Sequence, residues 1–295
     1  MGIIRSPAYN YYNDVVSEEL EEALNGLYLI KQGDKLPVGI ETITSDKLKS
    51  LKGKARRGRP GQPIPREIGE LETKVVYMLN IAHGFYLHED KLTAAQNSGQ
   101  KLPDTAARQS AQLVSKDLND FIFNGDAGYK TDGILDTTLE IAVANGSQWN
   151  SVGGGDPETV INDAFTLLEQ NDLFTGRKLG LRPVAYRKMF KRIPNTSATY
   201  ASLIAEYFDN GVNDIIKVPV GFPTGVDGVL GDYGPKIAER VPSKDIILKE
   251  RSINEDGNIP YNIETDQSID VKETDAFVLL KNLIDTTRLP VSGGS

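Results

Sequence analysis

The chain has no cysteine, only two histidines and a single tryptophan among its 295 residues. Without cysteine it cannot form disulfides, thiolate metal sites or a cysteine nucleophile. It also lacks an apolar run of about 18 residues, the length that a membrane-spanning helix needs. The first residues, MGIIRSPAYNYYND, have no apolar core of the signal-peptide type. The expectation is a soluble intracellular protein without a membrane partner.

Histidine is too scarce to support most catalytic arrangements. His88-Glu89-Asp90 invites an acid/base or metal interpretation, with His83 nearby. However, a spacing of five does not put two imidazoles on one helical face, and neither a His-Glu-x-x-His nor a Gly-x-Ser-x-Gly pattern is present. Gly153-Gly154-Gly155 precedes a helix start but lacks the Lys-Ser/Thr ending of a phosphate-binding loop. The sequence therefore predicts no catalytic residue, no metal and no cofactor.

Charge is unevenly distributed along the chain. There are 41 acidic and 33 basic residues, which gives a net charge of −8 and argues against a protein that coats nucleic acid. The acids near the C-terminal end, from Glu255 to Asp275, do not follow a calcium-loop spacing, and we expect a solvated face there. Basic residues crowd instead into one Pro- and Gly-rich stretch: Lys47, Lys49, Lys52, Lys54, Arg56, Arg57 and Arg59.

This basic, Pro- and Gly-rich stretch cannot be a core element, and it therefore predicts a long loop that projects from the body. Three roles are open: a nucleic-acid patch, a merely solvated loop, or a loop that lies across an acidic neighbouring subunit. The first lacks interleaved aromatic residues for stacking on bases. The third is supported by charge, because the chain without these seven residues would carry about −15.

One long helix is the clearest element in the sequence. Apolar residues recur at steps of three and four and form a single stripe, as a buried helix face requires: Ala107, Ala111, Val114, Leu118 and Phe121. Pro103-Asp104 is a helix start signal, and Asn124-Gly125 is a stop signal. The pattern predicts a helix of about 20 residues, roughly 30 Å long, packed against a strand near Val75–Leu79 and against the C-terminal part.

The other elements are predicted to be shorter. Residues 1–16 carry three tyrosines without periodicity and are interpreted as an arm, followed by a short helix over Ser17–Leu24. A strand over 70–86 and a helix over 87–97 precede the long helix. From Gly133 to about 234 helices and short strands alternate. The remainder favours four strands: 245–250, 259–264, 268–272 and 276–283.

The stretch AARQSAQLVSKDLNDFIFNGDAGYKTDGILDTT resembles the HK97-type shell proteins, a family that comprises the major capsid proteins of tailed viruses and the encapsulins. The resemblance lies in an alanine-rich start to the long helix, in Ile122-Phe123-Asn124-Gly125 at its end, and in Gly133-Ile134. It implies an α+β, HK97-like capsid fold. The implied domains are an N-terminal arm (1–31), an extended loop (32–72), a peripheral domain with the long spine helix (73–132), an axial domain (133–234) and a β-rich return (235–295).

By this resemblance the chain is expected to be a structural protein and not an enzyme. The expected function is that of a major capsid protein whose pentamers and hexamers build an icosahedral phage head around double-stranded DNA, without reading its sequence. It would be assembled in the host cytoplasm and found in the virion, with portal, scaffold or decoration proteins as further partners. The basic loop would contact the neighbouring subunit.

Two alternatives stay open. The first is an encapsulin nanocompartment, whose interior holds a cargo peptide in an apolar groove partly lined by an N-terminal helix; Ser17–Leu24 is the candidate here. The second is a small α+β enzyme that uses His83 or His88 with nearby acids.

Overall fold

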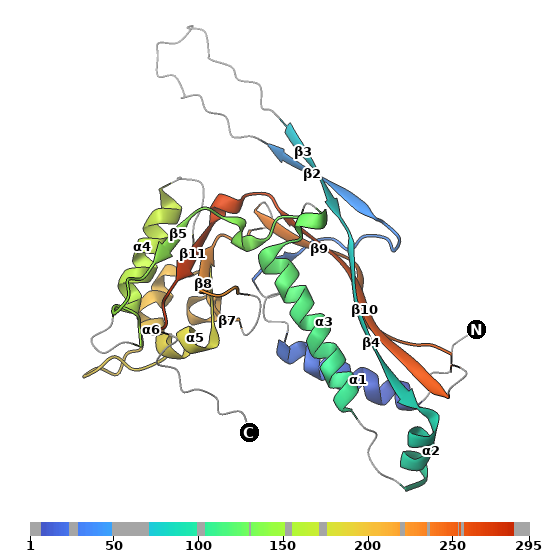
Figure 1. Ribbon diagram of the computed structural model, residues 1–295. Helices are drawn as coiled ribbons and strands as arrows, with labels where there is room; N and C mark the ends of the chain where they lie inside the picture. Colours follow the sequence, from blue (N-terminus) through green and yellow to red (C-terminus); the bar gives the residue numbers. More distant parts are fainter. Residues whose placement is uncertain are drawn as a thin grey trace.

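The computed structural model describes residues 7–23, 29–48, 71–98, 104–129, 131–150, 155–170, 176–218, 222–234, 237–252, 254 and 257–285. Helices and strands are mixed along the chain and form two separate sheets and a projecting hairpin (Figure 1). The fold class is therefore α+β, as predicted. Within these residues no helix is both long enough and apolar enough to cross a membrane.

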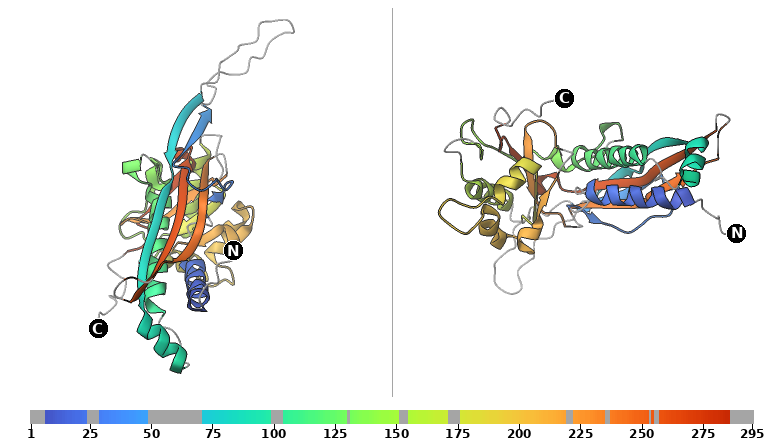
Figure 2. Two further views of the ribbon diagram at one scale, coloured as in Figure 1. Left: turned by 90° about the vertical axis from the view of Figure 1, so that its right-hand side faces the viewer. Right: turned by 90° about the horizontal axis from the view of Figure 1, so that it is seen from below.

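The first sheet has four strands in the order β1-β9-β10-β4: β1 (Lys31–Gln32), β9 (Ala238–Glu250), β10 (Asn258–Val271) and β4 (Leu79–His88). The long strands β9, β10 and β4 are antiparallel. Helices α1 (Pro7–Ala23) and α3 (Thr105–Asn124) lie side by side and pack on this sheet (Figure 2). The helix predicted between Pro103-Asp104 and Asn124-Gly125 is thus confirmed.

Aromatic side chains fill the space between these helices and the sheet. Tyr12 of α1 contacts Phe85 of β4 and Tyr261 of β10, with ring centroids 5.5 and 5.3 Å apart, and the last two rings stack at 5.2 Å. Tyr12 and Tyr261 are fully buried. Each buried aromatic ring removes a large apolar area from water, so this three-ring cluster holds α1 to the sheet.

The second sheet has five strands in the order β5-β11-β8-β6-β7: β5 (Glu140–Ala142), β11 (Phe277–Lys281), β8 (Val226–Gly231), β6 (Lys178–Leu181) and β7 (Ile215–Lys217). Helices α4 (Pro157–Glu169) and α5 (Pro183–Met189) pack on it, and α6 (Tyr200–Ile204) packs against both of these helices. Every residue of β8 is buried, as are the first four of β11, so these neighbouring strands form the centre of this half.

The hairpin β2 (Thr42–Leu48) and β3 (Leu71–Tyr77) projects from the body beyond the end of the four-stranded sheet (Figure 1). A short helix, α2 (Glu89–Ser98), follows β4 at the opposite end. The strand predicted over 70–86 is therefore two strands, and β4 runs two residues further, to His88, before the helix begins.

The N-terminal prediction was wrong. Residues 7–23 form one helix, whereas the sequence was interpreted as an arm followed by a short helix from Ser17. Tyr9, Tyr12, Val16 and Leu20 recur every three or four residues, and all four are buried. The period was overlooked because the exposed or half-buried neighbours Asn10 and Tyr11 interrupt it.

Three further expectations need correction. The stripe of α3 packs on β10, which confirms the predicted contact with the C-terminal part, but its other main partner in the sheet is β4, which begins only at Leu79. Strands expected at 259–264 and 268–272 are the single strand β10, which stays continuous through a register irregularity near Asp266. The strand expected at 276–283 is β11, and it joins the five-stranded sheet. The domain boundaries themselves stay a prediction, with residues 235–295 contributing strands to both sheets.

The expected solvated acidic face is also wrong in part. Glu264 and Asp270 on β10 are buried. Glu264 forms ion pairs with Lys244 and Lys249 of β9, and Asp270 accepts a hydrogen bond from the Ser45 hydroxyl. Burial acts to raise the pKa of Glu264, but the hydrogen bonds and charges of the two lysines outweigh it and hold this pKa below its usual range.

Candidate functional site

The end of α3 is a tight corner that turns the chain towards the second sheet. Gly125 has φ +63°, and a Cβ there would lie 2.2 Å from the Thr131 carbonyl oxygen. A Cβ on Gly133 would lie 2.3 Å from the Phe123 carbonyl oxygen. Both positions therefore require glycine. These are two of the glycines that carry the family resemblance, and their role is close approach of backbone to backbone.

Hydrogen bonds close this corner. Asp126 and Thr131 exchange two backbone hydrogen bonds at 2.9 and 3.0 Å, and the Asp136 carboxylate accepts the N–H of Gly133 at 2.8 Å. Ile134 is fully buried directly after the turn. Since the corner has little freedom, it sets how α3 and the five-stranded sheet are placed relative to each other.

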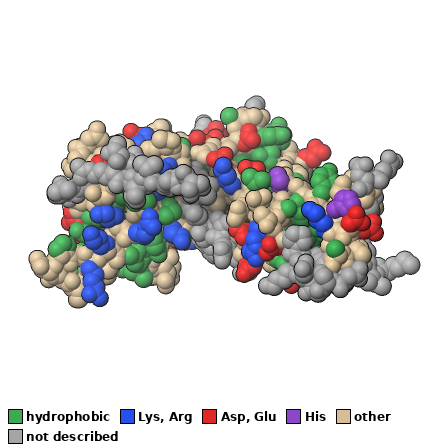
Figure 3. All heavy atoms as spheres, turned by 60° about the horizontal axis from the view of Figure 1, so that its bottom comes forward, with side chains coloured by type: hydrophobic (Ala, Val, Ile, Leu, Met, Phe, Trp, Pro, Cys, Tyr) green, Lys and Arg blue, Asp and Glu red, His purple; other side chains and the backbone are tan. Residues whose placement is uncertain are grey.

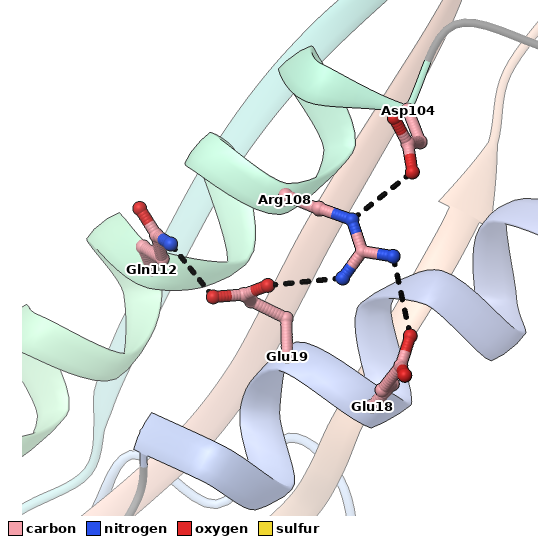
Figure 4. Close-up of polar contacts among 5 residues, drawn as sticks. All are labelled: Glu18, Glu19, Asp104, Arg108 and Gln112. Atoms are coloured by element: carbon pink, nitrogen blue, oxygen red, sulfur yellow. Dashed lines mark hydrogen bonds and ion pairs between the residues drawn. The ribbon is translucent and has the colours of Figure 1, made fainter.

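A polar clamp joins α1 to α3 (Figure 4). The Arg108 guanidinium contacts the carboxylates of Asp104, Glu18 and Glu19, at 3.0, 3.2 and 3.2 Å. Gln112, one turn further along α3, donates to Glu19 at 2.6 Å. The hydrogen bond to Asp104, with those to Glu19 and Glu18, raises the pKa of Arg108, which keeps its charge at every working pH.

The base of the β2–β3 hairpin is fixed by bonds to the body. Ser45 donates to Asp270, Lys74 pairs with Asp132, and Ser268 donates to the Tyr77 carbonyl at 2.9 Å. Ser45, Lys74, Asp132 and Asp270 line a cavity of about 300 Å³. The two strands pair from Thr42↔Tyr77 to Leu48↔Leu71, so the ends of the intervening segment are held side by side. The hairpin is a supported extension of the fold.

Apolar side chains are exposed where this hairpin meets the body. Val75 and Tyr77 of β3 and Tyr129 after α3 are 49%, 39% and 49% exposed, and the two tyrosine rings lie 6.2 Å apart. A group of exposed apolar residues on a projecting element is the kind of surface that other chains contact.

The residues predicted to act in subunit contact fall mostly outside the described chain. Lys49, Lys52, Lys54, Arg56, Arg57 and Arg59 lie there; Lys47 belongs to β2, where its backbone pairs opposite Glu72. Their contact with a neighbour stays a prediction. The five residues of the helix stripe, Ala107, Ala111, Val114, Leu118 and Phe121, are all buried on α3.

The two histidines are not brought together into a site. His83 Nδ1 lies 3.0 Å from the Ser110 hydroxyl, between β4 and α3, and His88 Nδ1 lies 3.5 Å from an Asp90 carboxylate oxygen. Among the described residues no group of three or more histidine or acidic side chains could hold a metal ion. This geometry offers no support for the enzyme alternative.

The fold defines a class of protein. The structure is similar to that of a virus-like particle from Pyrococcus furiosus, with a TM-score of 0.63 and 15% identity over 94% of this chain and 100% of that chain. It is also similar to the capsid of Myoviridae phage XM1, with a TM-score of 0.62 and 15% identity over 88% and 91% of the two chains. A structure of Mycobacterium phage Ogopogo is likewise similar, with a TM-score of 0.62 and 13% identity over 87% of this chain and 91% of that chain. The chain therefore has the HK97-like capsid fold, as predicted.

The family follows from the sequence. The model of the family described as "Encapsulating protein for peroxidase" matches residues 4–220, so the chain belongs to this family. A curated relative, the type 1 encapsulin shell protein EncA of Myxococcus xanthus, is 22% identical over 293 residues, covering 97% of this chain and 96% of the relative. The chain is a shell-forming protein of the capsid and encapsulin type.

Proposed function

We propose that this protein builds a closed encapsulin-type shell, inside the cell, around a protein cargo. The observation that carries the proposal is the family match over residues 4–220, in a family described by the encapsulation of peroxidase. The name of the Myxococcus xanthus relative, a shell protein of type 1 encapsulin, agrees with it. The role is structural, with many copies of the same chain as the main partner.

The N-terminal helix adds support. The resemblance to encapsulins implies such a helix beside the cargo groove, and α1 is longer and more firmly held than the sequence suggested. It packs through Tyr12 and Val16, is clamped by Arg108, and its Tyr9 hydroxyl donates to the Leu248 carbonyl at 2.9 Å. A fixed helix is a better wall for a groove than an extended arm, because less ordering entropy is lost when a peptide binds.

The second candidate is the phage head predicted from the sequence. It is favoured by the similarity to phage capsids at TM-scores of 0.62. In that case the particle would be a virion that encloses double-stranded DNA, and portal, scaffold or decoration proteins would be further partners. The two candidates share the same shell and differ in what fills it.

Electron microscopy and light scattering of the purified chain test the common part of both candidates. The expected result is closed particles of one size, each made of many copies. A small discrete oligomer as the only species would overturn the shell.

The contents then separate the two candidates. Particles isolated from the native cells would be treated with protease and nuclease, opened, and examined by mass spectrometry and gel. The proposal expects one protected protein in a fixed ratio to the shell. Protected DNA of uniform, genome-like length without such a protein would contradict the encapsulin proposal and favour the phage head.

A further inference from the structure

Two helices on the five-stranded sheet carry opposite charges. The segment that contains α4, residues 155–170, has four acidic residues and no Lys or Arg: Asp156, Glu158, Asp163 and Glu169. The segment from 177 to 205, which contains α5, has seven basic residues and no Asp or Glu: Arg177, Lys178, Arg182, Arg187, Lys188, Lys191 and Arg192. Figure 3 shows Lys and Arg side chains gathered on the left part of the molecule, where this sheet lies.

The two helices lie towards opposite edges of the sheet. α4 packs on β5, β11 and β8, whereas α5 packs on β6 and β7. β5 and β7 are the outer strands of the five. α6 contacts both α4 and α5, and Figure 1 shows α5 to the right of α4. One flank of the sheet is therefore acidic and the other is basic.

Some of the basic residues have partners in their own chain. Arg177 pairs with Asp232 at 3.0 Å, and Arg182 lies 3.7 Å from Asp227. Four others have no ion-pair partner anywhere in the described chain, and we call them the basic flank: Arg187, Lys188, Lys191 and Arg192.

The basic flank is crowded. Arg187, Lys191 and Arg192 are exposed, and Lys188 is half-buried. Burial lowers the pKa of Lys188, and the nearby charge of Lys191 lowers it further.

The acidic side is equally unpaired. Glu158, Asp163 and Glu169, the acidic flank, form no ion pair with any described residue. The helix dipole accounts for Glu158 in the first turn of α4, and for Arg187 and Lys188 in the last turn of α5. It does not account for Glu169, which ends α4 where the dipole disfavours an acid, or for Asp163 in the middle.

We propose that the acidic flank of one copy contacts the basic flank of the next copy, so that these halves join head to tail around a ring. This inference rests on the proposed shell, and it names the surface and the partner: a second copy of this chain. Two different, complementary patches on one molecule make a heterologous contact, and such contacts close into rings when the rotation between copies permits. Exposed charges of opposite sign also steer copies into one orientation and penalise the reverse one.

A charge-swap series tests the pairing. E158K/D163K/E169K reverses the acidic flank, and R187E/K191E/R192E reverses the basic flank. Each triple variant should reduce the assembled fraction, measured by light scattering and electron microscopy, by at least tenfold. All six substitutions in one chain invert both flanks and restore complementarity, so assembly should return to near the level of the unmodified chain.

Net charge needs its own control, because the six-fold variant also restores the total charge. Lys31, Lys91 and Lys116 are exposed on β1, α2 and α3, away from the second sheet. The combination of E158K/D163K/E169K with K31E/K91E/K116E has the original net charge but no inverted flank. It should stay unassembled. Equal rescue by this control would overturn the inference.

Folding and the shell itself are checked in the same series. Circular dichroism and unfolding midpoints of the dissociated subunits show whether each variant folds; if the lysine triple does not, E158Q/D163N/E169Q takes its place and should weaken assembly less. Failure of the unmodified chain to form particles counts against the proposed function. Normal particles from either triple variant, with the unmodified chain also assembling, would overturn only the flank pairing.

Discussion

Single residues explain why parts of this sequence resemble a family. Gly125 and Gly133 lie where two stretches of backbone meet at the end of α3, with no room for a side chain. A side chain at either position would clash with the backbone, so glycine is strongly favoured there. This constraint is why a short sequence motif could indicate the fold. The sequence around these glycines is freer to vary, because exposed positions of α3 such as Gln109 and Lys116 contribute little to packing.

Replacement of Gly125 by alanine should destabilise the subunit by about 2 kcal/mol or more, because it combines a positive φ with a clash against the Thr131 carbonyl. Gly146→Ala is the matched control, since Gly146 has φ +90° but a Cβ there meets nothing within 4 Å. Urea unfolding of both variants separates strain from the clash. Equal losses would show that the corner is not tightly packed.

Glu264 should make the free energy of unfolding depend on pH in the acidic range. Its folded pKa is depressed, so its contribution is fully present above the unfolded value of about 4.3 and is lost as pH falls through the lower folded value. Glu264→Gln should cost about 2 kcal/mol at pH 7, since it removes charge-assisted hydrogen bonds to Lys244 and Lys249. It should also flatten the decline of stability below about pH 4.

A control for this prediction is Asp245→Asn, which removes an exposed partner of Lys35 and should change stability little. Thermal unfolding between pH 3 and 7 measures both variants. A Glu264→Gln variant with the same decline in acid as the unmodified chain would contradict the assignment.

At the scale of elements, α1 is held by side chains far away in the sequence. Arg108 of α3 reaches Glu18 and Glu19 across the helix interface. Arg108→Ala should therefore loosen the C-terminal half of α1 while its N-terminal half stays packed through Tyr12. Hydrogen exchange should become faster over residues 15–20 and stay unchanged in β4 and β10.

Lys116→Ala, an exposed change on the same helix, is the matched control and should leave exchange in α1 unaltered. Unchanged exchange of residues 15–20 in Arg108→Ala would mean that apolar packing alone holds the helix.

The elements also show what could be predicted and what could not. α3 was identified because its apolar residues keep a clean period of three and four. α1 has a similar stripe, but the sequence of tyrosines beside Asn10 concealed it. The pairing of β11 between β5 and β8 was beyond the sequence, because partner choice depends on contacts over long separations. The basic flank was overlooked, although a stretch from 177 to 205 without one acid is visible in the sequence.

For the whole molecule, the basic loop predicts a dependence of assembly on charge. Reversal of Arg56, Arg57 and Arg59 to Glu should impair particle formation and leave the subunit folded, because loop charges are expected to meet an acidic neighbour. K31E/K91E/K116E, with the same change in net charge, is the control and should still assemble. The assembled fraction is measured by light scattering over a range of salt. Normal particles from the loop variant would refute the predicted role of the loop.

The position of β11 has a consequence for synthesis. Residues 277–281 fill the gap between β5 and β8, although β5 ends 135 positions and β8 ends 46 positions before β11 begins. A nascent polypeptide consequently exposes an unfilled sheet until residue 281 has left the ribosome. The acidic and basic flanks lie on helices that pack on this sheet, so we expect them to reach their final positions only late in translation. If copies join through these flanks, assembly would wait until each copy is complete.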